Sequence, residues 1–138
     1  MSTPSAHDLE LQVDPNRGRD LPHDVLARIR EHSKRMFGNQ DRLEVAVAIT
    51  RVELGRVNAT DLHHDTGIAV NRVRAQLLAL ESLGLLAKTG NDNGKRVFTR
   101  VDRDDRFWSF AVGEYADRME AARAAQGAST DAVGVTAA

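Results

Sequence analysis

The segment from Gly67 to Leu86 constrains the fold of this chain most, because it carries a turn, a helix and the start of a strand in one short run. Four apolar residues recur at helical spacing and predict a buried stripe on a helix over residues 70–83: Val73, Leu77, Leu80 and Leu83. Gly84 suits the left-handed position that ends a helix. The polar residues at the start of this helix fall mainly off the stripe, so they are free to contact a partner.

A β-hairpin is predicted directly after this helix. Residues 85–89 indicate a strand, and residues 95–101 alternate between two faces as a half-buried strand does. The run Gly90-Asn91-Asp92-Asn93-Gly94 between them is a strong turn signal. The segment 85–101 is therefore expected to form a hairpin wing beside the helix.

Further helices are predicted on both sides of this unit, over residues 21–37, 42–54, 61–66 and 106–125. Asn39 is expected to cap the second of them, and Thr60 the third. The fold class is mainly α with a small β-hairpin wing, hence α+β. Residues 1–20 are expected to be a flexible arm, 21–125 one domain, and 126–138 a disordered tail.

The composition narrows the classes of protein to which the chain can belong. It contains no cysteine, which excludes disulfides, thiolate metal sites and cysteine nucleophiles. No apolar run has the length of a membrane span, and the N-terminus lacks the pattern of a signal peptide, so a cytoplasmic location without membrane contact is expected.

The distribution of charge indicates a local basic surface. The formal net charge is −1, yet residues 67–101 hold six basic and only two acidic side chains. Contact with phosphates requires such a focused surface and does not require a basic chain as a whole. A merely solvated face is the alternative.

These features resemble the winged helix-turn-helix transcriptional regulators, most nearly the ArsR/MarR-like group. The resemblance covers roughly residues 38–101 and rests on the turn at Gly67, the ending Leu80-Glu81-x-x-Gly84-Leu85-Leu86 and the wing. It implies helices around a three-helix core, a one-bridge strand at 56–58, and terminal dimerisation helices. Two positions depart from the family pattern: Ala69 stands where a capping serine or threonine is common, and His63 where a small alanine is common.

The resemblance implies a homodimeric DNA-binding regulator, most simply a repressor, with double-stranded DNA as its partner. Arg72 and Arg74 are the leading base-reading residues, because arginine can bind guanine through two hydrogen bonds. The full set of expected DNA contacts is Thr60, Val70, Asn71, Arg72, Arg74, Ala75 and Gln76 on the helices, and Lys95, Arg96 and Arg100 on the wing. The alternative is a winged helix that uses this surface to bind another protein.

The first and last helices are expected to form the dimer interface. Most of the aromatic residues of the chain lie in the last helix, which favours burial against a second chain. The expected interface residues are Leu21, Val25 and Ile29, and Phe107, Trp108, Phe110 and Tyr115.

Neither a metal site nor a catalytic site is expected. His63 and His64 are adjacent and diverge by about 100 degrees on a helix, while His64 and Asp61 alone make a poor site. No glycine-rich phosphate loop and no nucleophile paired with a histidine is recognisable, so no cofactor and no enzymatic activity are expected. A ligand- or metal-responsive sensor of the same fold remains open, with its effector unknown.

Overall fold

The computed structural model describes residues 17–102 and 105–137, with side chains through residue 125. The elements are η1 (Gly18–Asp20), α2 (His23–Phe37), α3 (Arg42–Thr50), β1 (Arg56–Val57), α4 (Ala59–Thr66), α5 (Val70–Ser82), β2 (Leu86–Asp92), β3 (Lys95–Arg100) and α6 (Arg106–Ala137). The mainly helical α+β architecture and the order of elements are as predicted from the sequence.

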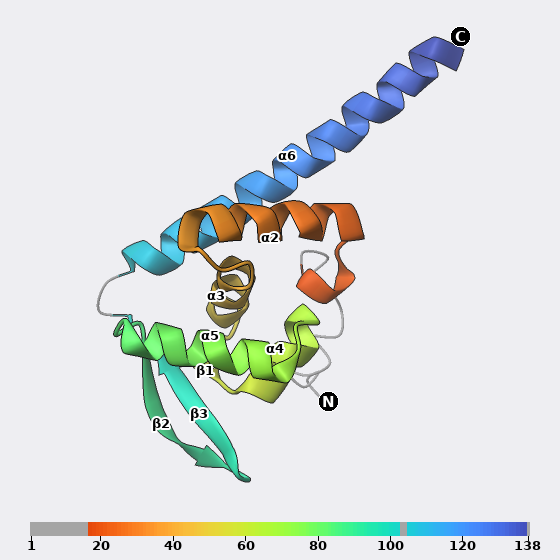
Figure 1. Ribbon diagram of the computed structural model, residues 1–138. Coiled ribbons are helices and arrows are strands. Elements are labelled where there is room, and N and C mark those ends of the chain that lie inside the picture. The colour runs from red at the N-terminus through yellow and green to blue at the C-terminus, as the bar shows by residue number, and fades with distance from the viewer. Residues whose placement is uncertain (1–16, 103–104, 138) are drawn as a thin grey trace, which may run out of the picture.

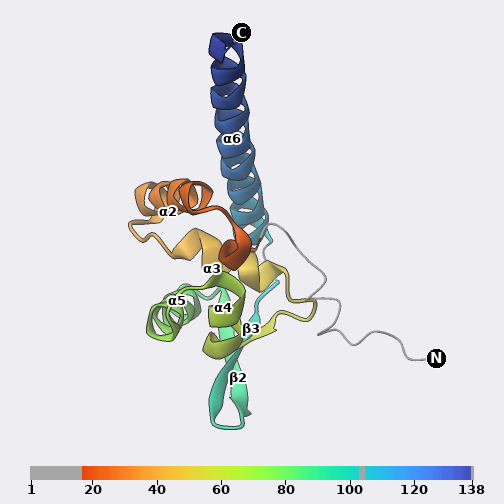
Figure 2. The same ribbon diagram turned by 90° about the vertical axis from the view of Figure 1, so that its right-hand side faces the viewer.

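Helix α3 lies at the centre of the molecule, and every residue from Leu43 to Ile49 is buried. Helices α2 and α6 pack on one side of it, whereas α4, α5 and the wing lie on the other (Figures 1 and 2). One hydrophobic core joins the two sides, and its largest members include Ile29, Leu43, Ile49, Leu62, Leu77 and Phe98. The terminal helices and the helix-turn-helix therefore form one packed unit.

The three strands form an antiparallel sheet in the order β1-β3-β2. The short strand β1 pairs with β3 through Arg56 with Thr99 and Val57 with Phe98, so a two-residue strand lies where a one-bridge strand was expected. β2 continues to Asp92, so the hairpin loop is only Asn93-Gly94, shorter than the predicted turn. Both loop residues have positive φ, at 52° and 79°, as a two-residue loop that matches the strand twist requires.

The start of α3 is held by side chains of other segments. Asn39 does not cap the helix; its Oδ1 accepts a hydrogen bond from Asp41 N at 2.8 Å. Ser33 of α2 acts instead, because its Oγ accepts from Leu43 N at 3.0 Å and donates to the Asn39 carbonyl at 2.7 Å. Satisfying a free N–H at a helix start is what a capping side chain does, and here it comes from the preceding helix.

The last residues of the predicted flexible arm, which was expected over residues 1–20, belong to a described element of the fold. Residues 1–16 lie outside the described residues, but Gly18–Asp20 form a 3-10 turn packed on α4. Arg17 pairs with Asp65 at 3.2 Å. Gly18 is buried because it lacks a Cβ, which would lie 2.0 Å from Glu44 Oε2. These contacts attach the segment to the domain.

Helix α6 also differs from its predicted extent. It continues through Ala137, beyond the predicted end at residue 125, and projects from the body in Figure 1. The alanine-rich run 121–125 favours this continuation, because alanine is the strongest helix former. No helix among the described residues is both long and apolar enough to cross a bilayer.

Several residues expected at a dimer interface lie in the core of the chain itself. Val25 and Ile29 of α2 are buried, as are Trp108 and Tyr115 of α6. The buried face of α6 runs through Trp108, Ala111, Tyr115, Met119 and Ala122, at the spacing of one helix face. Leu21 and Phe107 are half-buried against this core, and Phe110 is 48% exposed. Of the expected set, Phe110 is the residue that the chain itself leaves open.

Candidate nucleic-acid interface

The turn between α4 and α5 sets the geometry of the helix-turn-helix. Asn58, not Thr60, caps α4: its Oδ1 accepts a hydrogen bond from Asp61 N at 2.9 Å. Thr60 is half-buried in the first turn of the helix. Both residue types cap helices well, and Asn58 acts because it precedes the first helical residue with extended backbone. Gly67 ends α4 with a φ of 77°, as the predicted turn requires.

The two departures from the family pattern are accommodated within this turn. Ala69 precedes α5 and has no side-chain oxygen to cap it. The turn is held instead by Thr66, whose Oγ1 accepts from Ile68 N at 3.1 Å and donates to the Leu62 carbonyl at 2.8 Å. His63 Nδ1 donates to the Ile68 carbonyl at 2.6 Å. These bonds cross-link the turn, so the histidine has a structural role here.

Helix α5 has one fully buried and one exposed side. Val73, Leu77 and Leu80 are fully buried, which confirms the predicted stripe, although Leu83 at its end is 61% exposed. The exposed side carries Asn71, Arg74, Ala75, Leu78 and Ser82, with Val70 half-buried at the start of the helix. Residues three or four apart share a helix face, so these side chains form one continuous surface. We call this surface the α5 stripe.

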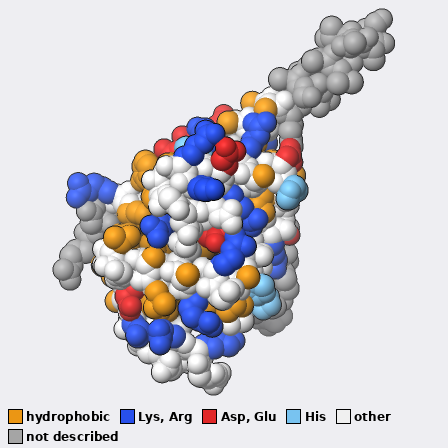
Figure 3. Space-filling view, viewed as in Figure 1, with side chains coloured by type: hydrophobic (Ala, Val, Ile, Leu, Met, Phe, Trp, Pro, Cys, Tyr) orange, Lys and Arg blue, Asp and Glu red, His pale blue; other side chains and the backbone are white. Residues whose placement is uncertain are grey.

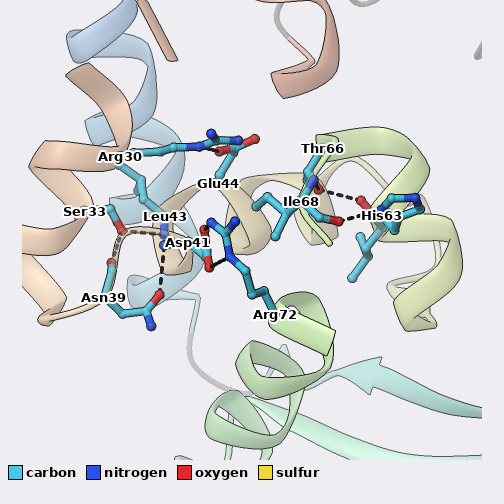
Figure 4. Close-up of polar contacts among 11 residues, drawn as sticks. Arg30, Ser33, Asn39, Asp41, Leu43, Glu44, His63, Thr66, Ile68 and Arg72 are labelled. Atoms are coloured by element: carbon cyan, nitrogen blue, oxygen red, sulfur yellow. Dashed lines mark hydrogen bonds and ion pairs between the residues drawn. The ribbon is translucent and has the colours of Figure 1, made fainter. Parts of the chain in front are cut away.

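Arg72 does not belong to the α5 stripe, because it is bound to the start of α3. Its Nε donates to Asp41 Oδ2 at 3.0 Å and its Nη2 to Oδ1 at 2.5 Å (Figure 4). Asp41 is 4% exposed. The hydrogen bond that Arg72 donates to this carboxylate raises the pKa of Arg72 above its ordinary value. The expectation that Arg72 reads a base therefore conflicts with its place in the fold.

Gln76, for which a DNA contact was expected, is likewise bound within the fold. Its side chain is buried at 3% exposure, and its Oε1 accepts from Arg42 Nε at 3.1 Å. A buried amide needs its hydrogen-bond partners, because leaving one unpaired costs about 1–3 kcal/mol. Arg42 supplies one from α3, so Gln76 faces the interior.

The wing shows the same division among its basic residues. Lys95 and Arg96 are exposed near the hairpin tip. Arg100 at the base of the wing is bound to the body, since its Nη1 donates to the Ile49 and Thr50 carbonyls at 3.5 Å and its Nε to Asp102 Oδ1 at 2.6 Å. The expected phosphate contact of Arg100 is thus replaced by contacts to the end of α3.

A hollow of about 270 Å³ lies between α5 and the wing. Its lining includes Arg74 from the α5 stripe and Arg96 and Asn91 from the wing. Two guanidinium groups from separate elements therefore border one depression, and Figure 3 shows basic side chains gathered at this end of the molecule. The arrangement suits a ligand with closely spaced negative charges.

Sequence reasoning missed three contributors to this region. Leu78 lies outside the predicted buried stripe, and a leucine off that stripe is expected to be exposed, as it is. Asn91 was assigned to the turn but lies in β2. Asp41, which binds Arg72, gave no signal, because its partner is 31 residues away.

Comparisons with known proteins address the fold. No protein-family model matches the chain, and no curated protein matches its sequence. Sco5413, a MarR family transcriptional regulator from Streptomyces coelicolor, superposes with a TM-score of 0.56 at 19% identity, over 82% of this chain and 84% of that one. The YusO protein from Bacillus subtilis superposes with a TM-score of 0.52 at 16% identity, over 96% and 95% of the two chains. These likenesses cover most of the chain, and they show that it has the winged-helix fold seen in a MarR family regulator.

Proposed function

We propose that this protein is a sequence-specific transcriptional regulator that binds double-stranded DNA. The α5 stripe enters the major groove and the wing lies along the backbone or the adjacent minor groove, as in winged helices generally. The observation that carries the proposal is the pairing of Arg74 and Arg96 at one hollow between these elements. Occupying a duplex site excludes other proteins from it, so repression is the direct consequence of binding.

Within this proposal the base-reading residues are fewer than the sequence indicated. Asn71 and Arg74 carry hydrogen-bonding groups on the exposed side of α5, while Ala75 and Leu78 offer apolar contact to a thymine methyl group. At the starts of α5 and α4, the backbone N–H of Val70 and the hydroxyl of Thr60 suit contacts to phosphates. Lys95 and Arg96 bind phosphates without reading sequence.

The test begins with duplexes selected by the purified protein from random or genomic DNA. Arg74→Glu should weaken binding to the selected duplex by about 10- to 100-fold, since one good base contact contributes about 1–3 kcal/mol. Arg28→Glu makes the same charge change at an exposed site on α2, away from α5, and when sedimentation shows this variant to assemble as the wild-type chain does, its affinity should be nearly unchanged. Equal affinities for the two variants, or binding that ignores salt concentration, would contradict the proposal and favour a protein-binding surface.

We further propose that the protein acts as a homodimer through α2 and α6. A symmetric dimer presents two α5 stripes to successive major grooves, about 34 Å apart. Phe110 and Val112 are the large apolar side chains that the described part of α6 leaves exposed, at 48% and 44%. Two residues apart, they lie on different sides of the helix, so one contact surface would use Phe110 or Val112 but not both.

Sedimentation at micromolar concentration tests this assembly. The wild-type chain should be a dimer, and Phe110→Glu should shift it to a monomer with weaker DNA binding. Leu54→Glu is the matched control, because Leu54 is 80% exposed in the loop between α3 and β1. This variant should remain dimeric. A monomeric wild-type chain would remove the dimer from the proposal.

A further inference from the structure

Two polar links join the start of α3 to consecutive turns of α5. Asp41 binds Arg72 through two hydrogen bonds, and the adjacent Arg42 binds Gln76. Arg72 and Gln76 are four residues apart, so they lie one above the other on the same helix side. Each attachment lies off the helix axis and so opposes rotation of α5 about that axis, and two attachments one turn apart also oppose tilting of the helix.

The α3 end of these links is itself anchored. Asp41 N donates to Asn39 Oδ1, and Ser33 of α2 binds both the Asn39 carbonyl and Leu43 N, as Figure 4 shows. The backbone that carries the Asp41 carboxylate is therefore held by Asn39 and by α2, independently of Arg72. A fixed carboxylate and a forked guanidinium define one relative orientation, because the two parallel bonds are directional.

We propose that Asp41 and Arg72 are a positioning pair that sets the rotation of α5 in the DNA groove, and that Arg72 does not bind DNA. The inference rests on the proposed function. To reach a base or a phosphate, Arg72 would have to leave a carboxylate that is 4% exposed without its charged partner. With the pair intact, the rotation of α5 directs Asn71 and Arg74 outward together.

A double-mutant cycle on the selected duplex tests this role. Asp41→Asn and Arg72→Met should each weaken specific binding by about 10-fold and relax the preference at the same base pairs, while the double variant should be no weaker than the weaker single variant. The dependence of affinity on salt should be unchanged in all three, because no phosphate contact is lost.

A direct contact from Arg72 to DNA predicts the opposite for Asp41→Asn. That variant would release the guanidinium, so affinity would be retained or increased, whereas Arg72→Met alone would lower the salt slope by about 0.9. Either result would overturn the positioning role. Arg74→Gln is the control that should lower the salt slope or alter base preference without depending on Asp41.

A third variant keeps the test informative if Arg72→Met folds poorly. Arg72→Lys retains the charge but not the two-pronged geometry. Under the positioning role, Arg72→Lys should relax the base preference as Asp41→Asn does. If Arg72→Lys instead retained both the base preference and the salt slope of the wild-type protein, that result would contradict the positioning role. Thermal unfolding and the near-ultraviolet signal of buried Trp108 verify that each variant is folded at the binding temperature. A wild-type chain that binds no duplex would refute the proposed function itself, which is a different outcome.

Discussion

Arg72 and Arg74 are the same residue type in the first turns of one helix, yet they belong to different regions of the molecule. Arg74 is exposed at the hollow beside the wing, while Arg72 is bound to a buried carboxylate of α3. Breaking a buried ion pair costs about 3–5 kcal/mol, and less here because the Arg72 side chain is 42% exposed. A base contact returns about 1–3 kcal/mol, so exchanging one for the other brings Arg72 little or no gain.

The wing repeats this contrast between Arg96 and Arg100. Arg96 lies open near the tip, whereas Arg100 donates to the last carbonyls of α3. Cations near a helix C-terminus are favourable, because the free carbonyls there carry partial negative charge. In both elements, therefore, the basic residue that meets α3 supports the fold and the other faces outward. Comparing the inward and outward member of each pair gives the predictions below.

The largest expected difference is between two adjacent leucines of α5. Leu77 is fully buried, so Leu77→Ala should lower the free energy of unfolding by about 2–5 kcal/mol. Leu78 is 39% exposed, and Leu78→Ala should change stability by less than about 1 kcal/mol while weakening binding to the selected duplex. Chemical unfolding and DNA titration of both variants measure the two effects. Similar losses of stability would show that α5 is oriented differently.

A smaller difference is expected between Arg100→Gln and Arg96→Gln. The first should lower the free energy of unfolding by about 1–2 kcal/mol, because carbonyl groups of α3 lose a charged donor, and it should leave the salt slope of DNA binding unchanged. The second should leave stability unchanged and lower the slope by about 0.9, and Lys95→Gln should act in the same way. If Arg100→Gln alone altered the slope, its assignment to the fold would be wrong.

The smallest effect concerns Glu44, which lies in the same buried polar layer as Asp41. It is 1% exposed; Oε1 accepts from Arg30 at 3.1 Å, while Oε2 has no hydrogen-bond partner among the described residues. Burial raises the pKa of this carboxyl above its ordinary value, although Arg30 opposes the shift. The folded chain therefore holds the Glu44 proton more tightly than the unfolded chain does.

It follows that Glu44 lowers stability as pH rises from the unfolded pKa through the raised folded pKa. Glu44→Gln removes this dependence and keeps an oxygen for Arg30, so at pH 7 it should raise the free energy of unfolding by on the order of 1 kcal/mol. The gain should disappear at the acid end, where the wild-type carboxyl is protonated in both states. Unfolding of both proteins at several pH values checks this, and a variant that is less stable at pH 7 would show that attraction to Arg30 outweighs desolvation.

The elements that could be predicted from the sequence are those with local signals. The bounds of α5, the position of the wing and the turn at Gly67 follow from apolar spacing and glycine positions within a few residues. Helix α3 ends at Thr50 rather than at the predicted Leu54. At this end, Thr50 Oγ1 donates a hydrogen bond to the Val47 carbonyl. Such side-chain bonds compete locally with the helix and are not visible in hydrophobic spacing.

The candidate site was predicted less well, because its members depend on contacts distant in sequence. Nothing in the sequence around Gln76 indicates that Arg42, 34 residues earlier, donates a hydrogen bond to its side chain. The aromatic residues of α6 were all predicted to meet a second chain, but Trp108 and Tyr115 lie in the core of this chain and Phe110 is exposed. Trp108 faces inward because Ala111, Tyr115 and Met119 follow it on the same helix side. A spacing pattern predicts which face of a helix is buried, but it does not predict which residues of other elements will pack against that face.

The bond from Ser33 to Leu43 N has a practical consequence for dissecting the protein. A fragment that begins at residue 38 contains every element of the helix-turn-helix and the wing, and by topology alone it is a complete winged helix. This fragment lacks the Ser33 hydroxyl that caps the start of its central helix α3, and it also lacks the apolar side chains of α2 that cover α3. We therefore expect the smallest piece of this chain that folds independently to be larger than the winged-helix motif and to include α2, which packs on the side of α3 away from the proposed DNA surface.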